Sequence, residues 1–198
     1  MTILFIDCCI RKAESRTLSL CDAFLDEVRR RHPGVSVRTL SLGDEGITAM
    51  NREQLKRRDE LIQEKRLDDA QFDYAREFAA ADYILTGAPY WDLSFPACLK
   101  NYIERISVNE IAFTYVQEGS LGLCKAKKMM YISTAGGFVP ESGHAGEAYM
   151  KQLSSFYGIG QFESYCLEGL DIIGTDVKGK MEEAAAEVKA LAAKWIEK

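Results

Sequence analysis

The chain has 198 residues, of which 47% are hydrophobic and 28% are charged, and its formal net charge is −5 at pH 7. This composition is typical of a globular protein with one well-buried core, and the negative charge disfavours nucleic acid or an anionic membrane as a partner. The N-terminal segment lacks the basic region of a signal peptide, and no apolar run reaches the length of a transmembrane helix. We therefore expect a cytoplasmic protein with a single domain over residues 1–198.

The cysteines favour a reducing compartment. None forms a CxxC pair or stands near a histidine, so the sequence predicts no metal site. Several fall inside expected strands or helices, which favours free buried thiols over disulfides. The six positions are Cys8, Cys9, Cys21, Cys98, Cys124 and Cys166.

Strand-like and helical segments alternate from end to end. The apolar run TILFID predicts a strand that is covered on both faces, whereas VSVRTLSL alternates in polarity and suits a strand nearer the sheet edge. Strands are expected at 2–7, 35–42, 82–89, 127–137 and 162–170, and helices at about 17–31, 51–79, 96–106, 144–157 and 176–196. This alternation predicts a doubly wound α/β domain with a parallel sheet and helices on both faces.

Ligands of such sheets bind beyond the carboxyl ends of the strands, near the point where the strand order reverses. This rule selects the loops at residues 8–17, 88–96 and 134–146. All three have unusual sequences, and we expect them to form one site.

The first loop ends at a helix start that suits an anion. Ser15 and Thr17 bring hydroxyl groups to that start, and Arg16, Arg11 and Lys12 add positive charge. The alternative is that Ser15 or Thr17 only caps the helix. The loop matches neither a GxxxxGK[ST] phosphate loop nor a GxGxxG dinucleotide motif.

The second loop holds aromatic side chains in a short rigid segment. Pro89 and Pro96 restrict its ends, and Tyr90, Trp91 and Asp92 lie between them. Flat apolar surface beside polar groups suits a heteroaromatic ring with hydrogen-bonding atoms on its rim. The alternative is that these aromatic residues belong to the core or to a subunit interface.

The third loop, STAGG, ends a strand in two glycines. Gly136 and Gly137 allow a ligand to approach the backbone and leave N–H groups free to donate, although an ordinary tight turn would also use them. His144 follows, either as a functional histidine or as a solvated or helix-capping one.

These segments together resemble the family of FMN-dependent NADH-azoreductases and NAD(P)H quinone dehydrogenases. SRTLSL resembles the family's Ser-x-Ser phosphate loop, with Thr17 in place of the second serine. APYWDLSFPACLKNYIERI resembles its Ala-Pro-Met-Tyr-Asn-Phe segment and the Leu-Lys-x-Tyr helix, and residues 112–137 resemble its Phe-x-Tyr, Gly-Leu and Gly-Gly pattern. The resemblance covers nearly the whole chain. It implies a flavodoxin-like fold with five parallel strands in the order 2-1-3-4-5.

The resemblance also implies bound FMN, with NADH or NADPH as the electron donor. The flavin itself would perform the chemistry, and His144 would at most modulate it. The phosphate would lie on residues 15–17, the ring on residues 89–93 and its pyrimidine edge against residues 134–137. The implied cofactor-binding residues are Cys9, Arg11, Ser15, Arg16, Thr17, Pro89, Tyr90, Trp91, Asp92, Leu93, Thr134, Ala135, Gly136 and Gly137.

Three departures from the family pattern leave the natural acceptor open. A serine common after the first strand is here Cys8 or Cys9, and the usual asparagine is Asp92. The family's Met-Tyr pair is Tyr90-Trp91, which reshapes the substrate slot.

The implied activity is two-electron reduction of quinones or of azo and other aromatic acceptors by a ping-pong mechanism. The family also implies a homodimer with its active site at the subunit interface, where Phe113 and Tyr115, in the loop before the fourth strand, would line the slot. The charged helix at 51–79 could cover the site or the partner, but its KRRDE run favours an ordinary solvated surface. The alternative function is an FMN-binding electron carrier that does not oxidise NAD(P)H. A serine hydrolase is disfavoured because the sequence has no GxSxG motif.

Overall fold

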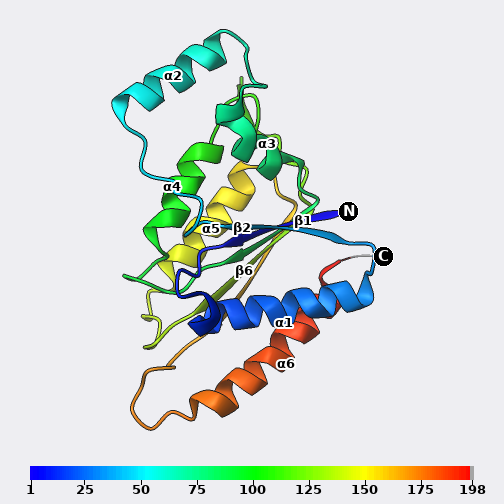
Figure 1. Cartoon of the computed structure of the whole chain (residues 1–198), viewed down its shortest axis with the longest axis vertical. Coiled ribbons are helices and arrows are strands. Elements are labelled where there is room, and N and C mark those ends of the chain that lie inside the picture. Colours follow the sequence, from blue (N-terminus) through cyan, green and yellow to red (C-terminus); the bar gives the residue numbers. More distant parts are fainter. Residues whose placement is uncertain (197–198) are drawn as a thin grey trace.

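A five-stranded parallel sheet forms the centre of the structure, a computed structural model that describes residues 1–196 (Figure 1). The strands pair side by side in the order β2 (Ser36–Ser41), β1 (Thr2–Asp7), β3 (Tyr83–Gly87), β6 (Lys128–Thr134) and β7 (Gln161–Leu167). The predicted α/β class is confirmed. Counted within this sheet alone, the order is 2-1-3-4-5, because β4 and β5 form a separate hairpin.

Burial along the strands follows their place in the sheet. In β3 and β6 every residue is buried, and in β1 every residue after Thr2 is buried, as the continuous apolar run predicts for a strand covered on both faces. Strand β2 lies at an edge of the sheet and buries only Leu40, which confirms the edge position expected from its alternating sequence.

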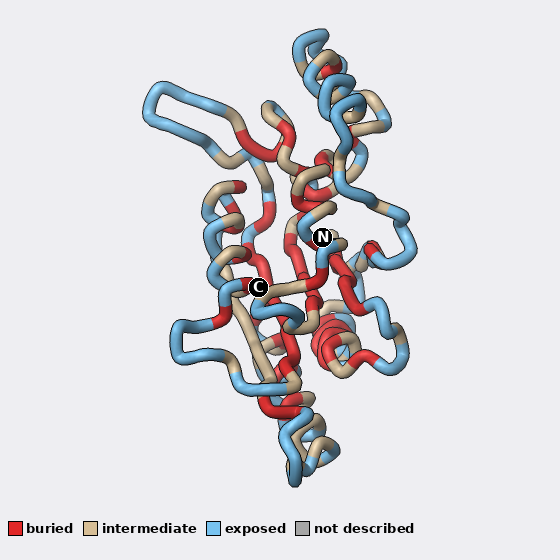
Figure 2. The backbone as a smooth tube through the Cα atoms, turned by 90° about the vertical axis from the view of Figure 1, so that its left-hand side faces the viewer, coloured by how far each residue is buried: buried red, intermediate tan, exposed pale blue. Residues whose placement is uncertain are grey.

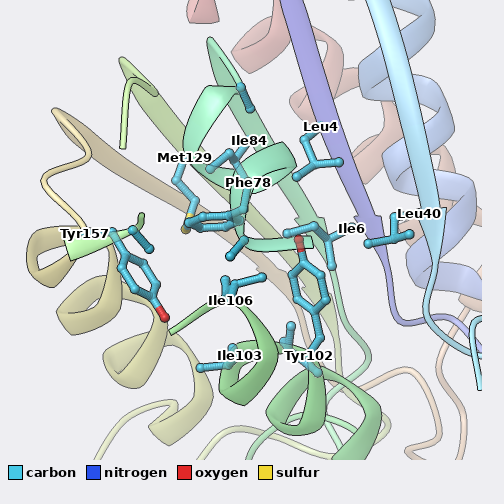
Figure 3. Close-up of a cluster of buried hydrophobic side chains, with 14 of the residues drawn as sticks. Leu4, Ile6, Leu40, Phe78, Ile84, Tyr102, Ile103, Ile106, Met129 and Tyr157 are labelled. Carbon is cyan, nitrogen blue, oxygen red and sulfur yellow. The ribbon is translucent and has the colours of Figure 1, made fainter. Parts of the chain in front are cut away.

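Two hydrophobic cores lie on opposite faces of the sheet. Helices α1 (Arg16–Arg31) and α6 (Val177–Trp195) cover one face, where Phe24 and Trp195 meet with ring centroids 5.1 Å apart (Figure 1). Helices α3 (Asp73–Ala80), α4 (Ala97–Ile106) and α5 (Ala145–Phe156) cover the other face, where their apolar side chains pack on alternate strand residues such as Leu4 and Ile6 (Figure 3). The two cores fix the sheet and leave the loops at the strand ends free to form a site.

The sequence predicts one charged helix over 51–79, but the structure shows that this stretch is broken. It forms α2 (Arg52–Gln63), a short 3-10 turn (Ala70–Phe72) and α3. The break falls at Lys65, whose φ is 58°, and the guanidinium of Arg76 donates to the carbonyl oxygens of Leu67 and Asp69. Helix α2 projects from the body at the top of Figure 1 and buries only Leu61.

The segment before β6 is a hairpin rather than the expected loop. Strands β4 (Phe113–Val116) and β5 (Gly119–Gly122) pair antiparallel. Gly122 lies so close to the backbone of Tyr157 and Gly158 that a Cβ atom there would be 2.1 Å from both. The hairpin is therefore attached at its glycine end, and its other residues are largely exposed.

Figure 2 shows buried residues gathered in the middle of the molecule and exposed residues along the outer loops. None of the helices within residues 1–196 is both long and apolar enough to cross a bilayer. All six cysteines are free, with Cys8, Cys9 and Cys21 buried.

Candidate cofactor site

The three predicted loops meet in one cleft of about 260 Å³ at the carboxyl ends of β1, β3 and β6. Most of the predicted cofactor-binding residues line it, but Asp92, Leu93 and Gly137 do not. The lining residues are Cys9, Ile10, Arg11, Glu14, Ser15, Arg16, Thr17, Pro89, Tyr90, Trp91, Thr134, Ala135, Gly136, Leu170 and Asp171. The rule that selects loops at strand ends therefore locates the cleft.

The first loop is fixed by the buried carboxylate of Asp7 at the end of β1. One of its oxygens accepts from the backbone N–H of Cys9 at 2.8 Å and the other from the hydroxyl of Ser41 at 3.0 Å. The ammonium of Lys12 lies 4.0 Å from Asp7 and 2.5 Å from Asp44. The carboxylate of Asp7 thus fixes the conformation of the loop between β1 and α1. Lys12 forms ion pairs with Asp7 and Asp44 and is therefore not free to bind a ligand.

Cys8 and Cys9 stand where the family commonly has a serine, and of the two Cys9 lines the cleft. Its Sγ donates to the carbonyl oxygen of Gly87 at 3.7 Å. Burial raises the pKa of this thiol to about 12, so it remains protonated at neutral pH. Cys9 therefore adds no charge to the cleft, and its thiol proton is directed to a backbone carbonyl.

The N-terminus of α1 presents free donors to the cleft, and this group, called the anion cradle below, consists of the N–H groups of Arg16 and Thr17 with the guanidinium of Arg11. Ser15 caps the helix, since its Oγ accepts from the N–H of Leu18 at 3.2 Å. Within residues 1–196 the N–H groups of Arg16 and Thr17 make no hydrogen bond, and Arg11 makes no ion pair. Capping and anion binding are therefore compatible, because different donors serve them.

Thr17 ties the cradle to the end of β6. Its Oγ1 lies 2.7 Å from Oγ1 of Thr134, and both residues are buried. This bond joins the first and third loops across the cleft floor. The start of α1 is held in place from the sheet as well as through its own helix.

The loop after β7 contributes residues that the sequence analysis missed. Asp171 accepts a hydrogen bond from the guanidinium of Arg16 at 2.7 Å, and its N–H donates to the carbonyl oxygen of Gly136 at 2.8 Å. A Cβ atom on Gly136 would lie 2.2 Å from Oδ2 of Asp171, so a larger residue there would displace the Asp171 carboxylate. Leu170 lines the cleft beside it, as do Ile10 and Glu14 of the first loop. The strand-end rule could have found this loop, because β7 belongs to the same sheet.

The aromatic turn, defined here as Tyr90–Ser94, is a tight two-residue hairpin. Trp91 and Ser94 exchange two backbone hydrogen bonds, of 3.3 and 2.8 Å, and Tyr90 donates to the carbonyl oxygen of Thr134 at 2.9 Å. The central residues Asp92 and Leu93 have φ of 50° and 65°. Neither is glycine, so each such conformation costs about 1–3 kcal/mol. The turn stores backbone strain and exposes apolar surface, with Trp91 37% and Leu93 62% exposed.

Free backbone donors border the cleft at the end of β6. The N–H groups of Gly136 and Gly137 make no hydrogen bond within the described residues, whereas Ala135 donates to Leu167. Phe113 and Tyr115, expected at the substrate slot, lie on β4 and do not line the cleft of their own chain. Phe113 packs against Phe156 with ring centroids 4.6 Å apart, and Tyr115 is 72% exposed.

His144 is buried and caps α5. Its Nδ1 accepts from the N–H of Glu147 at 3.0 Å, and its Nε2 lies 3.3 Å from the hydroxyl of Ser133. Burial lowers the pKa of this imidazole from its ordinary value. It does not line the cleft. Of the two readings of His144, the structure shows the helix cap.

A family model described as a flavodoxin-like fold matches residues 1–192. The chain belongs to this family. An FMN-dependent NADH:quinone oxidoreductase 2 of Clostridium perfringens is 34% identical over 195 residues, which cover 98% of each chain. A protein of the same name from Clostridium acetobutylicum is 37% identical over 179 residues, covering 88% of this chain and 89% of the other. The resemblance seen in the sequence is thereby confirmed.

Solved structures share the fold of this flavodoxin-like protein. An azoreductase from Bacillus anthracis has a TM-score of 0.87 at 23% identity, covering 98% of this chain and 99% of the other. An FMN-dependent NADH-azoreductase from the same species, in complex with FMN, has a TM-score of 0.85 at 18% identity, covering 99% of each chain. At these identities the comparison establishes the fold alone.

Proposed function

We propose that this protein is an FMN-dependent NAD(P)H oxidoreductase that reduces quinones or azo and other aromatic acceptors by two electrons. The observation that carries the proposal is the meeting of an anion cradle and an aromatic turn in one cleft. The first suits a phosphate and the second a flat heteroaromatic ring, and FMN contains both. The names of the curated relatives support the cofactor, the donor and the quinone acceptor.

The donor set of the cleft fits the phosphate of FMN. Two unpaired N–H groups at the positive end of α1 and the guanidinium of Arg11 supply charge and hydrogen bonds to a dianion. Arg16 can add a second guanidinium, since its partner Asp171 is largely exposed and also accessible to water. Ser15 and Thr17 keep the cradle in shape through their own hydrogen bonds.

Residues 89–93 would hold the flavin ring, with its polar edge toward residues 134–137. When bound there, FMN supplies hydride transfer between the nicotinamide and the acceptor. The free N–H groups of Gly136 and Gly137 would stabilise negative charge at that edge. The exposed carboxylate of Asp92 would stand where an amide is usual in the family, which disfavours anionic acceptors close to the turn.

A cleft of this size would leave one face of a bound flavin ring open. Its volume of about 260 Å³ is small for a site that encloses a whole aromatic ligand. Trp91, which lines the cleft, is 37% exposed, and Leu93 in the same turn is 62% exposed. Donor and acceptor would then use the same open face in turn, which is the basis of the ping-pong order that we propose.

A second copy of the chain would complete the site. In one chain Phe113 and Tyr115 lie outside the cleft, so their role at the slot requires a homodimer that brings a hairpin to the partner's open face. We also propose a cytoplasmic location, supported by six free thiols, and a single domain, supported by one sheet that unites strands from Thr2–Asp7 to Gln161–Leu167.

The test is an anaerobic absorbance titration of the protein reconstituted with FMN. We expect NADH or NADPH to bleach the bound flavin by two electrons and benzoquinone to restore its absorbance. Free FMN at the same concentration is the control for reduction in solution. Binding of FMN without reduction by either nucleotide would favour the electron-carrier alternative, and absence of FMN binding would overturn the proposal.

A further inference from the structure

The N-terminus of α5 forms the support on which the aromatic turn rests. The ring of His144 meets the ring of Tyr90 edge-on, with centroids 4.5 Å apart and an interplanar angle of 71°. A Cβ atom on Gly146 would lie 3.0 Å from the His144 ring, 3.1 Å from Phe95 and 3.2 Å from the backbone of Ser94. The start of α5 therefore packs against both ends of the aromatic turn, with His144 on Tyr90 and Gly146 on Ser94. A side chain larger than that of glycine would not fit at residue 146 without a shift of its neighbours.

The hydrogen bonds of His144 fix one tautomer. Because Nδ1 accepts from the N–H of Glu147, it carries no proton, so Nε2 carries the proton and donates to the hydroxyl of Ser133. The residue His144 is only 8% exposed. A second proton on Nδ1 would point at the N–H of Glu147 and remove the cap of α5. The geometry observed here thus requires a neutral ring.

Several titratable groups face the imidazole from the elements packed around it. Glu147 of α5 and Glu168 after β7 favour its protonation, whereas burial opposes protonation and dominates. Tyr131 of β6 meets the ring edge-on at 5.7 Å, and Tyr90 meets it from the aromatic turn. None of these groups is a cation, so only burial and the cap keep the ring neutral.

We propose that His144 is a positioning residue that holds Tyr90 in place beneath the ring of FMN, and that its protonation releases the aromatic turn and weakens FMN binding. This proposal rests on the proposed function. His144 touches neither the cleft nor the reacting atoms, and it acts through Tyr90 and through the start of α5. The affinity for FMN then depends on pH through a residue outside the cleft.

The pH range follows from the direction of the pKa shift. Because burial lowers the pKa of His144 below its ordinary value of 6.5, the unfolded chain binds this proton more readily than the folded one. The neutral His144 ring therefore stabilises the folded protein fully above pH 6.5. This stabilisation is lost as the pH falls through the lower pKa that His144 has in the folded state. FMN affinity should decline over the same range, since only the neutral form holds the turn.

Two substitutions distinguish the effect of the His144 ring on Tyr90 from the effect of the His144 cap on α5. His144→Asn retains a helix-capping oxygen but has no aromatic ring and does not titrate. His144→Phe retains a ring against Tyr90 but has no cap and does not titrate. At pH 8 we expect FMN to bind about three- to tenfold more weakly to the asparagine variant than to the wild type, the usual worth of an aromatic pair. The phenylalanine variant should bind FMN within about threefold of the wild type but unfold at lower temperature.

The experiment is a fluorescence titration of each apoprotein with FMN between pH 5 and 8, together with the thermal midpoint of each apoprotein at every pH. We expect the dissociation constant of FMN to rise below pH 6.5 more steeply for the wild type than for His144→Asn. The variant is the control for protonation of the FMN phosphate, which affects both proteins equally. The wild-type midpoint should fall over the same range relative to this variant.

Parallel curves for the wild type and His144→Asn, in a protein that binds FMN, would overturn the role of His144 and leave the proposed function intact. Failure of the wild type to bind FMN at any pH would overturn the proposed function and, with it, the role of His144 in FMN binding. The thermal midpoints of the apoproteins would still report whether the cap titrates.

Discussion

The anion cradle and the aromatic turn face the same cleft but are built in opposite ways. The cradle is the regular start of a 16-residue helix, tied to the sheet by the buried pair Thr17 and Thr134. The turn is an exposed two-residue hairpin held by two backbone hydrogen bonds, with both central residues at positive φ. The donors of the cradle are held in place by the fold and would suit any phosphate, whereas we expect the exposed turn to accept substitutions without unfolding of the domain.

The difference predicts that phosphate and ring contribute separately to FMN affinity. Arg11→Gln combined with Arg16→Gln removes the guanidinium of the cradle and that of Arg16, which also lines the cleft, and leaves the turn unchanged. Charge-assisted hydrogen bonds contribute about 1.5–3 kcal/mol each, so FMN should bind at least tenfold more weakly. Fluorescence titration measures this loss.

Riboflavin, which has the ring but no phosphate, is the matched ligand for this double variant. Its affinity should be the same in the variant and the wild type. A loss of riboflavin affinity as large as that of FMN would contradict the separation between cradle and turn.

Thr17→Val tests whether the cradle is rigid because of its tie to the sheet. The change leaves the buried hydroxyl of Thr134 without its partner, which should lower the free energy of unfolding by about 1–3 kcal/mol. Urea denaturation measures the change. The double variant Thr17→Val with Thr134→Val removes both hydroxyls and should recover most of the loss, because no polar group is then left unpaired. An additive loss in the double variant would show that the two hydroxyls are not coupled.

The cradle could be predicted from sequence because its determinants are local. ESRTLS contains the capping serine, the helix start and the positive charge within a few residues. The partner of Arg16 could not be predicted in this way, since Asp171 lies 155 residues further along the chain and reaches the cleft only through the pairing of β6 with β7. Tertiary pairing, not local preference, decides such contacts.

The turn was predicted only in part. The prolines at 89 and 96 indicate a restrained loop, but nothing in the letters Asp-Leu predicts two consecutive residues at positive φ, a conformation that asparagine and glycine normally supply. The break in the charged stretch at Lys65 has the same cause, a left-handed residue that is not glycine. The surrounding structure imposes these backbone conformations against the local preference of the residues. The hydrophobic periodicity of the sequence therefore does not predict them.

Trp91→Ala probes the turn and should spare the cradle. The indole is 37% exposed at the open end of the cleft, so its removal costs the protein little stability. Loss of one aromatic stacking contact, about 0.5–1.5 kcal/mol, should weaken FMN and riboflavin by the same factor of about three to ten. A loss confined to FMN would place Trp91 at the phosphate instead and would reverse the assignment of the two regions.

The smallest expected effect concerns the strain in the turn itself. Asp92→Asn with Leu93→Gly installs the Asn-Gly pair that this turn type prefers, and relief of strain should raise the free energy of unfolding by about 1 kcal/mol. Asp92→Asn alone is the control, because it changes the charge and leaves residue 93 strained. Urea denaturation of the three proteins measures the gain. If the strain serves to present Trp91 to the ring, the stabilised double variant should bind riboflavin less tightly than the control, and equal binding would show that the strain has no part in forming the site.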